Sequence, residues 1–207
     1  MSDSDIFCQV RQAHRICAAY YQRVLPRINR VADKLGAQFI QWTPISFDKP
    51  PSKSTVPFEH WGWRFLPLLD VSFTFGKKIS TSSNISPLDY ILDIRLISDS
   101  ELSLENREEI YGDDIEPDAC QLKNSVENSE SYLAIYLFSS SRNIRDRNIL
   151  DRLWRGDYPK LDTGIVEQSD DIKRIGFKHS LSVLQNDEDI DILERLIEEY
   201  LVILREY

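Results

Sequence analysis

Apolar positions in the first thirty-five residues recur with a helical period. Successive apolar or semi-apolar residues are separated by alternating steps of three and four, at Phe7, Val10, His14, Cys17, Tyr21, Val24, Ile28, Val31 and Leu35. This spacing places these side chains on one face of a helix. Pro26 lies within the pattern, and Gly36 follows its last residue, as is typical of a helix C-terminus. The pattern predicts one long N-terminal helix.

Most of the remaining hydrophobic positions are typical of β-strands. Alternation is clearest over residues 88–97, where one face is almost wholly apolar. Further strands are predicted over residues 38–47, 68–75 and 132–138, with weaker signals over 164–166 and 172–184. Helical spacing is present over residues 102–111, 143–155 and 187–207, the last of these with Asn186 as a candidate cap.

The order of these elements predicts the class of fold. No change in composition divides the chain into two complete cores. We therefore expect one α+β domain over residues 1–207, with a mainly antiparallel or mixed sheet between a long N-terminal helix and a C-terminal helix. The two terminal helices carry matching apolar stripes, so they could pack together or join two copies of the chain as a homodimer.

Charge is distributed unevenly along the chain. The formal net charge is −9, and residues 99–130, the acidic segment, hold eleven acidic residues against Arg107 and Lys123. This segment therefore accounts for the whole net charge. We expect a mobile insertion whose field repels nucleic acid and attracts a basic protein partner. Its candidate partner-binding residues, the acidic surface, are Glu105, Glu108, Glu109, Asp113, Asp114, Glu116 and Asp118.

Basic side chains also gather in two places. One stripe consists of Arg23, Arg27, Arg30 and Lys34, and a second cluster consists of Arg142, Arg145, Arg147, Arg152 and Arg155. Acidic residues are interleaved with both, and the C-terminal helix offers Glu194, Glu198 and Glu199 as partners. We expect these bases to be neutralised within the protein, which disfavours nucleic-acid binding.

The composition also bears on the compartment. No run of eighteen apolar residues is present, and the N-terminus carries acids where a secretory signal needs bases. Cys8, Cys17 and Cys120 are an odd number without close pairing. We therefore expect a cytoplasmic protein with reduced thiols and no membrane association.

Sequence motifs for the common enzyme chemistries are absent. The chain has no Gly-rich phosphate loop, no dinucleotide fingerprint and no Gly-x-Ser-x-Gly nucleophile elbow. None of the histidines, at positions 14, 60 and 179, has a partner at metal-ligand spacing. These observations predict no resident metal or cofactor and favour a protein that is not an enzyme.

Two carboxylates on neighbouring predicted strands offer one alternative. Asp70 and Asp93 could hold a divalent cation, Mg²⁺ or Mn²⁺, that activates water against a phosphodiester. Arg95 shares a face with Asp93 and could stabilise charge. The arrangement resembles the PD-(D/E)xK nuclease core over residues 6–138, although Pro67 lies three residues before the first aspartate and arginine replaces the expected lysine. The resemblance implies a metal-dependent nuclease-like enzyme with these three residues at its site.

The same residues also have a purely structural interpretation. Asp70 would end a turn, and Asp93 would pair with Arg95 or Lys77 on a solvated face. We therefore expect a non-catalytic cytosolic binding module whose acidic surface engages a basic protein partner, as an inhibitor, immunity protein or antitoxin does. The nuclease-like enzyme is the alternative, and it needs both carboxylates within reach of one metal ion.

Overall fold

The computed structural model describes residues 3–50, 52–54, 62–79, 84–145 and 158–207. The helices are α1 (Asp3–Lys34), α2 (Leu104–Tyr111) and α4 (Asp187–Glu206), with short 3-10 helices η2 (Gly62–Phe65), η3 (Ser100–Leu102), η4 (Val126–Asn128) and η5 (Leu181–Leu184). The strands are β1 (Gln38–Pro44), β2 (Asp70–Lys77), β3 (Tyr90–Ile97), β4 (Tyr132–Ser140), β5 (Glu167–Ser169) and β6 (Ile172–Ser180). Most of the helix predicted over residues 143–155, with Arg147, Arg152 and Arg155, lies outside the described residues.

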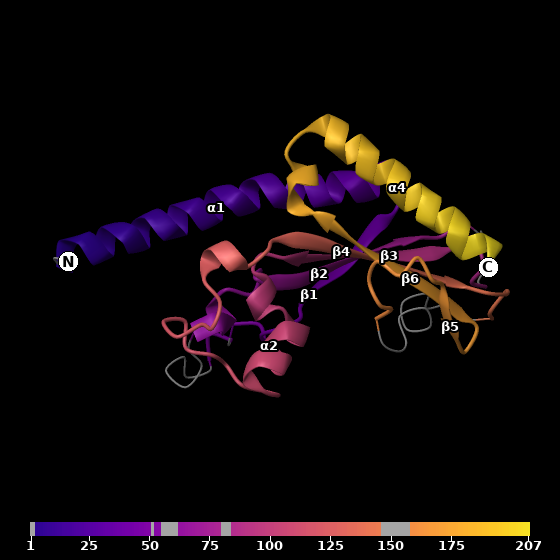
Figure 1. The fold of residues 1–207 in the computed structure, drawn as a ribbon. Helices are drawn as coiled ribbons and strands as arrows, with labels where there is room; N and C mark the ends of the chain where they lie inside the picture. Colours follow the sequence, from indigo (N-terminus) through magenta and orange to yellow (C-terminus); the bar gives the residue numbers. More distant parts are fainter. Residues whose placement is uncertain (1–2, 51, 55–61, 80–83, 146–157) are drawn as a thin grey trace.

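The strands form one six-stranded sheet in the order β1-β2-β3-β4-β6-β5. Each described pair of neighbouring strands is antiparallel. Helix α4 and the C-terminal half of α1 lie across the same face of this sheet (Figure 1). The architecture confirms the predicted α+β fold, with an antiparallel sheet flanked by the two terminal helices. Within the described residues, none of the helices combines the length and the apolarity needed to cross a membrane.

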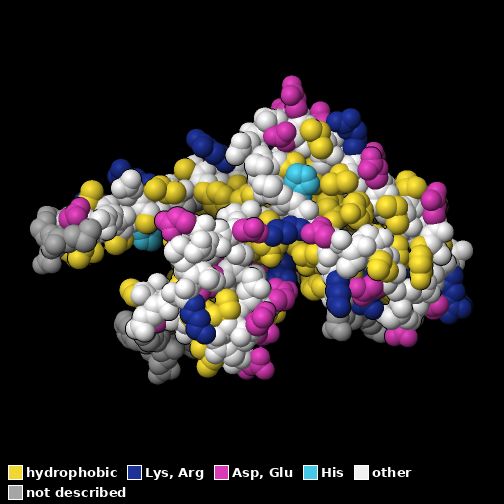
Figure 2. Space-filling model, in the orientation of Figure 1, with side chains coloured by type: hydrophobic (Ala, Val, Ile, Leu, Met, Phe, Trp, Pro, Cys, Tyr) yellow, Lys and Arg dark blue, Asp and Glu magenta, His cyan; other side chains and the backbone are white. Residues whose placement is uncertain are grey.

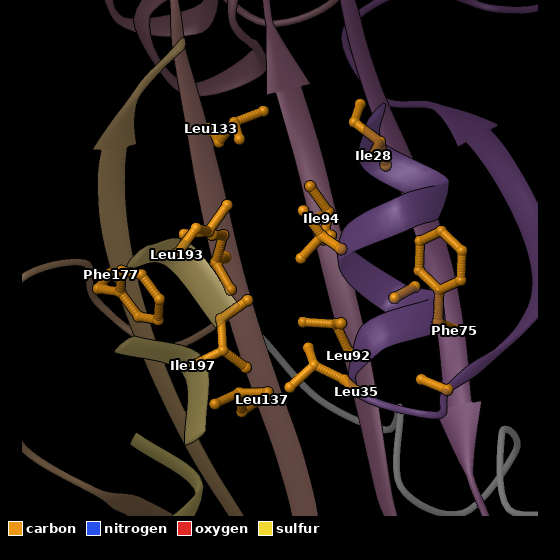
Figure 3. Close-up of a cluster of buried hydrophobic side chains, with 14 of the residues drawn as sticks. Ile28, Leu35, Phe75, Leu92, Ile94, Leu133, Leu137, Phe177, Leu193 and Ile197 are labelled. Atoms are coloured by element: carbon orange, nitrogen blue, oxygen red, sulfur yellow. The ribbon is translucent and has the colours of Figure 1, made fainter. Parts of the chain in front are cut away.

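The main core lies between the sheet and the two terminal helices. The alternating pattern of β3 directs Leu92 and Ile94 into it, and both are fully buried. Ile28 enters from α1 and Leu193 from α4, so that side chains of the sheet and of both helices meet (Figure 3). Burying each such side chain contributes roughly 1.5–3 kcal/mol of stabilisation. The core therefore fixes both helices on one face of the sheet.

Ion pairs complete the contact between α1 and α4. Arg30 pairs with Asp187 at 2.7 Å. Lys34 lies between Asp191 and Glu194, at 2.8 and 2.9 Å. The basic stripe of α1 is thus partly neutralised by the C-terminal helix, as expected, and one of its partners is the predicted Glu194. These terminal helices pack together within one chain.

The N-terminal half of α1 projects beyond the sheet (Figure 1). We call residues 5–19 the arm. The apolar stripe of α1 is buried from Val24 onwards, but on the arm Phe7 is 64% exposed and Val10 is 47% exposed. The predicted helix is confirmed, whereas only its C-terminal half has a core to pack against.

The opposite face of the sheet combines a smaller core with a polar row. Ile91, Ile97 and Phe138 are among the buried apolar residues of this face. Alternate residues of β2 and β3, including Asp70 and Asp93, point the same way. This second face of the sheet therefore carries the candidate catalytic residues.

Candidate functional site

The pairing of β2 with β3 brings the candidate catalytic residues onto one face. Ser72 lies opposite Arg95, and Thr74 lies opposite Asp93. Asp70 is two residues before Ser72, so its side chain lies diagonally across from Arg95. All of these side chains are buried, and Arg95 is only 1% exposed. Buried polar groups need partners, and the charged side chains of this row find them within the protein, whereas the hydroxyl of Thr74 has none among the described residues.

Arg95 lies between two carboxylates from different elements. Its Nε and Nη2 donate to the two oxygens of Asp70, each at 2.6 Å. Its Nη1 and Nη2 also donate to the two oxygens of Glu105 on α2, at 2.6 and 2.8 Å. The backbone N–H of Leu104 donates to Asp70 at 3.0 Å. Two bidentate pairs therefore tie the start of α2 to the sheet.

The ionisation of this cluster reflects burial and charge together. Burial raises the pKa of Asp70, and the guanidinium of Arg95 opposes that rise. Burial also acts to raise the pKa of Glu105, but the hydrogen bonds and charge of Arg95 outweigh it, so that this pKa is lowered. Burial acts to lower the pKa of Arg95, yet its hydrogen bonds to the two carboxylates prevail and raise it. The guanidinium is therefore a permanent cation between the two carboxyl groups.

Asp93 has a different set of partners. The Ser72 hydroxyl donates to one of its oxygens and the Tyr158 hydroxyl to the other, each at 2.5 Å. The ring of Tyr158 packs against that of Tyr136, with centroids 4.5 Å apart. Burial raises the pKa of Asp93 to about 6, and the two hydroxyl donors oppose the rise. Asp93 is thus a buried carboxyl held by neutral donors.

These contacts bear on whether Asp70 and Asp93 suit a divalent cation. All four carboxylate oxygens accept hydrogen bonds from protein donors, and Asp70 faces the fixed positive charge of Arg95. In the part of the chain that the structure describes, no group of three or more His, Cys, Asp or Glu side chains is placed to hold a metal ion. The donor set fits a structural ion-pair cluster better than a centre for Mg²⁺ or Mn²⁺.

The acidic segment is anchored to the body at Glu101. This buried carboxylate accepts hydrogen bonds from the backbone N–H groups of Lys123 at 2.8 Å and Asn124 at 3.0 Å. The hydroxyl of Tyr111, at the end of α2, also donates to it. One side chain thus joins η3, α2 and the chain that follows the acidic surface.

A second anchor of the acidic segment is Arg107, one of its two bases. Its side chain is buried and donates to the hydroxyl of Ser46 at 3.1 Å and to the carbonyl of Ile115 at 2.7 Å. Its guanidinium also lies over the ring of Phe47, 5.3 Å from the centroid. Arg107 therefore fixes the loop after α2 against the chain that follows β1.

These anchors leave the acidic surface in solvent. Six of its seven members are exposed and Glu108 is half-buried, and acidic side chains gather over α2 in Figure 2. Glu105 pairs with Arg95, and Glu116 pairs with Arg64 at 3.1 Å. The members that form no ion pair within the described residues are Glu109, Asp113, Asp114 and Asp118. The surface therefore keeps most of its negative charge.

A cavity adjoins the end of the acidic surface. Its volume is about 550 Å³, and its lining consists of Gly62, Trp63, Leu66, Glu116, Pro117, Asp118 and Ala119. The indole N–H of Trp63 donates to the carbonyl of Pro117 at 2.7 Å, which fixes the ring at the wall. Two carboxylates thus border an otherwise mostly apolar hollow. The sequence signal for the cavity is Trp63, whose contact with the acidic segment no local pattern predicts.

Comparison with known proteins gives two matches along most of the chain. The sequence model of a protein family described as PM0109 matches residues 2–201. A protein of Pasteurella multocida (strain Pm70), named "Uncharacterized protein PM0109", is 24% identical over 179 residues, which cover 83% of this chain and 77% of that protein. No solved structure matches the chain.

Proposed function

This chain belongs to the PM0109 family, and we propose that it is a non-catalytic binding module whose acidic surface engages a basic protein partner. An inhibitor, immunity protein or antitoxin has this kind of role. We place it in the cytoplasm, which suits the free cysteines at positions 8, 17 and 120. Self-association through the terminal helices is part of the same proposal.

The observation that carries the proposal is the exposure, on an anchored support, of acids that form no ion pair with any residue that the structure describes. Glu109, Asp113 and Asp114 lie on or just after α2 and point into solvent. Buried contacts of Glu101 and Arg107 hold this support against the body. Fixed charges lose little conformational entropy when a partner binds, and they steer a basic surface towards them.

The neighbouring cavity supports a protein rather than a small cation as the partner. Interfaces depend on a few apolar or aromatic anchors in desolvated pockets, surrounded by polar groups. Trp63 and Leu66 supply an apolar wall, while Glu116 and Asp118 stand at its border. A lysine or arginine of the partner could lay its methylene stem along that wall and direct its charge at the carboxylates.

The nuclease-like alternative draws less support from the same geometry. A metal ion at Asp70 would have to compete with Arg95, whose two nitrogens lie 2.6 Å from the carboxylate oxygens. An arginine in the lysine position holds its proton firmly and cannot serve as a compact ammonium beside a water. We therefore place this cluster in the scaffold of the binding module.

The test is affinity capture of the tagged full-length chain from the cytosol of its source, with quantitative mass spectrometry. One variant combines Glu109→Gln, Asp113→Asn and Asp114→Asn, which removes three charges from the acidic surface. The matched control combines Glu198→Gln, Glu199→Gln and Glu206→Gln, exposed acids of α4.

We expect a basic protein that the native chain and the control variant retain and the acidic-surface variant loses. The loss should be partial at low ionic strength and complete near physiological salt, because there the attraction between exposed charges more than about 8–10 Å apart is largely screened. Equal recovery by both variants would contradict the proposal, as would a retained partner that is acidic.

A further inference from the structure

A groove runs between α1 and η5 at the base of the arm. η5 packs against α1 at this point (Figure 1). The volume of the groove is about 760 Å³, and most of its lining is apolar or aromatic, from Ile16, Ala19, Tyr20, Val24, Leu181 and Leu184. Ile16 is 59% exposed. The groove therefore presents apolar surface on a different side of α1 from the exposed stripe of Phe7 and Val10.

Two contacts hold the walls of the groove in place. The guanidinium of Arg27 donates to the backbone carbonyl of Leu184, which ties η5 to α1. The hydroxyl groups of Tyr20 and Ser98 lie 3.3 Å apart, and this contact fixes the tyrosine ring against the chain that follows β3. A site with fixed walls loses little conformational entropy when a partner binds.

The charge of the groove is opposite to that of the whole protein. Residues 6–32 of α1 contain five arginines and no Asp or Glu, although the net charge of the chain is −9. Arg23 and Arg27 line the groove, and no acidic side chain is among the described residues that line it. Neither arginine forms an ion pair with any residue that the structure describes. Within the basic stripe, Arg30 and Lys34 are thus neutralised by α4, whereas the two arginines of the groove keep their charge.

The neutralised half of the basic stripe indicates what this side of α1 binds. Arg30 and Lys34 pair with three carboxylates of α4, those of Asp187, Asp191 and Glu194. Beside these carboxylates α4 buries an apolar stripe that includes Ile190, Leu193 and Ile197. An acidic amphipathic helix therefore already lies along the C-terminal half of α1. Because α4 begins beside Arg30, the groove at Arg23 and Arg27 lies before its first turn.

We propose that this groove binds an acidic amphipathic helix of a partner protein. Carboxylates on one flank of that helix pair with Arg23 and Arg27. Its apolar stripe packs on Ile16, Tyr20 and Leu181, in the way that α4 packs on the rest of α1. The groove is a second docking surface, additional to the acidic surface and opposite to it in charge.

The lining of the groove disfavours other anionic partners. A nucleic-acid backbone offers phosphates but no apolar stripe to cover Ile16 and Leu181, and the net charge of −9 repels it. A flat bilayer does not enter a concave site. A helix presents carboxylates and apolar side chains three and four positions apart, which matches the spacing of the arginines and apolar residues along α1.

The test is the binding of a fluorescein-labelled peptide to the full chain, measured by fluorescence anisotropy. The peptide has the sequence of α4, residues 187–206, because this acidic helix already fits α1. The control peptide has the same composition in a scrambled order without the amphipathic pattern. Arg23→Glu reverses a charge in the groove, and Arg205→Glu makes the same change in the last turn of α4. Ile16→Ser removes apolar surface from the groove. All three substituted residues are exposed, so the core stays intact.

We expect the native chain and Arg205→Glu to bind the peptide with similar micromolar affinity. Arg23→Glu should bind it about tenfold or more weakly, because a repulsive charge replaces an attractive one. Ile16→Ser should weaken binding about fivefold through the loss of apolar contact. Since α4 begins beside Arg30, a loss in Arg23→Glu places the peptide in the groove and not in the position of α4.

Several results would overturn the proposal. One is the absence of binding to the native chain, and another is equal binding by the two arginine variants. Equal binding of the scrambled peptide would mean that the groove attracts any acidic chain and does not select a helix. Displacement of the peptide by a DNA duplex or by phosphatidylglycerol vesicles, at lower concentration than by unlabelled peptide, would replace the helix with that partner. None of these outcomes depends on the acidic surface, which the capture experiment tests separately.

Discussion

At the scale of single residues, Arg95 stabilises the fold because it neutralises two carboxylates at once. Replacing it with methionine keeps most of the volume but leaves Asp70 buried without its counter-charge. We expect Arg95→Met to lower the free energy of unfolding by about 3–5 kcal/mol, the usual cost of breaking a buried pair. Chemical denaturation measures this loss.

The control for that prediction is Arg64→Met. Arg64 pairs with Glu116 at 3.1 Å, but both partners are partly exposed to solvent. Removing such a pair should cost less than about 1 kcal/mol. If the two variants lost equal stability, the buried cluster at Arg95 would contribute no more to the free energy of unfolding than an exposed ion pair does.

Asp93 should make stability depend on pH in an unusual direction. Burial raises its pKa from 3.8 to about 6 in the folded protein. Between these two pKa values the folded state binds more protons than the unfolded state. The stabilisation that this proton binding provides is therefore fully present below about pH 4 and is lost as the pH rises through 6. The shift corresponds to about 3 kcal/mol.

The variant Asp93→Asn isolates this effect from the other titrating groups. It keeps the shape and can still accept a hydrogen bond from Ser72. We expect its unfolding free energy to fall less steeply than that of the native protein between pH 4 and 7. Parallel pH profiles for the two proteins, from denaturant titrations, would show that Asp93 does not titrate in this window.

At the scale of elements, the contact between β4 and β6 depends on a residue without a side chain. Gly176 lies opposite Tyr136, and a Cβ there would come within 2.8 Å of the tyrosine ring. We expect Gly176→Ala to destabilise the protein by about 1–3 kcal/mol, since the rigid ring must move. Thermal unfolding measures the change.

Gly76→Ala is the matched comparison on β2. A Cβ there would come within 2.7 Å of Ile40, but the contact is with the flexible end of that side chain. The isoleucine can change rotamer, so the cost should be the smaller of the two. A larger loss of stability for Gly76→Ala would mean that Ile40 on β1 accommodates a new Cβ less readily than the Tyr136 ring on β4 does.

Arg107 should control the order of the loop that carries much of the acidic surface. Its guanidinium holds the carbonyl of Ile115 and the hydroxyl of Ser46. In Arg107→Ala we expect faster hydrogen exchange over residues 104–118, with little change in β3 and β4, because the loop loses its anchor while the core is intact. Unchanged exchange over residues 104–118 would show that the contacts of Glu101 alone are enough to hold this loop in place.

Local patterns predicted most elements because each depends on its own sequence. The alternation in residues 88–97 gave β3, and the cap at Asn186, which accepts from the backbone N–H of Asp189 at 2.9 Å, gave the start of α4. The helical stripe predicted α1, but it did not predict that only the C-terminal half of the helix is covered by the core. Periodicity says which side of a helix is apolar, and only the tertiary arrangement decides what lies against it.

The candidate site was harder to predict because its contacts are long-range. A period of two correctly placed Asp93 and Arg95 on one face. The pairing of Arg95 with Asp70 and Glu105 depends on strand register and on the return of α2 to the sheet, which no local pattern encodes. Tyr158 and Trp63 take part for the same reason, through contacts with residues more than fifty positions away.

At the scale of the whole molecule, the two candidate functions meet at one arginine. Glu105 belongs to the acidic surface and Asp70 to the resemblance with nucleases, and Arg95 binds both. The cluster that would have to release a carboxylate for metal is the one that positions α2. Freeing Asp70 for catalysis would therefore loosen the support of the acidic surface, so the proposed partner binding and the nuclease-like alternative compete for the same residues.

Calorimetric titration of the full chain with Mn²⁺ tests this competition. We expect only weak heats, equal in the native protein, in Asp70→Asn and in the surface variant Asp118→Asn, because exposed carboxylates bind the ion loosely and Asp70 is occupied by Arg95. These heats should decline with added salt. A saturable site that Asp70→Asn abolishes and Asp118→Asn preserves would mean that Arg95 yields its carboxylate to a cation. In that case Asp70 can exchange its ion pair with Arg95 for a bound cation, and the nuclease-like alternative would replace the binding module as the proposed function.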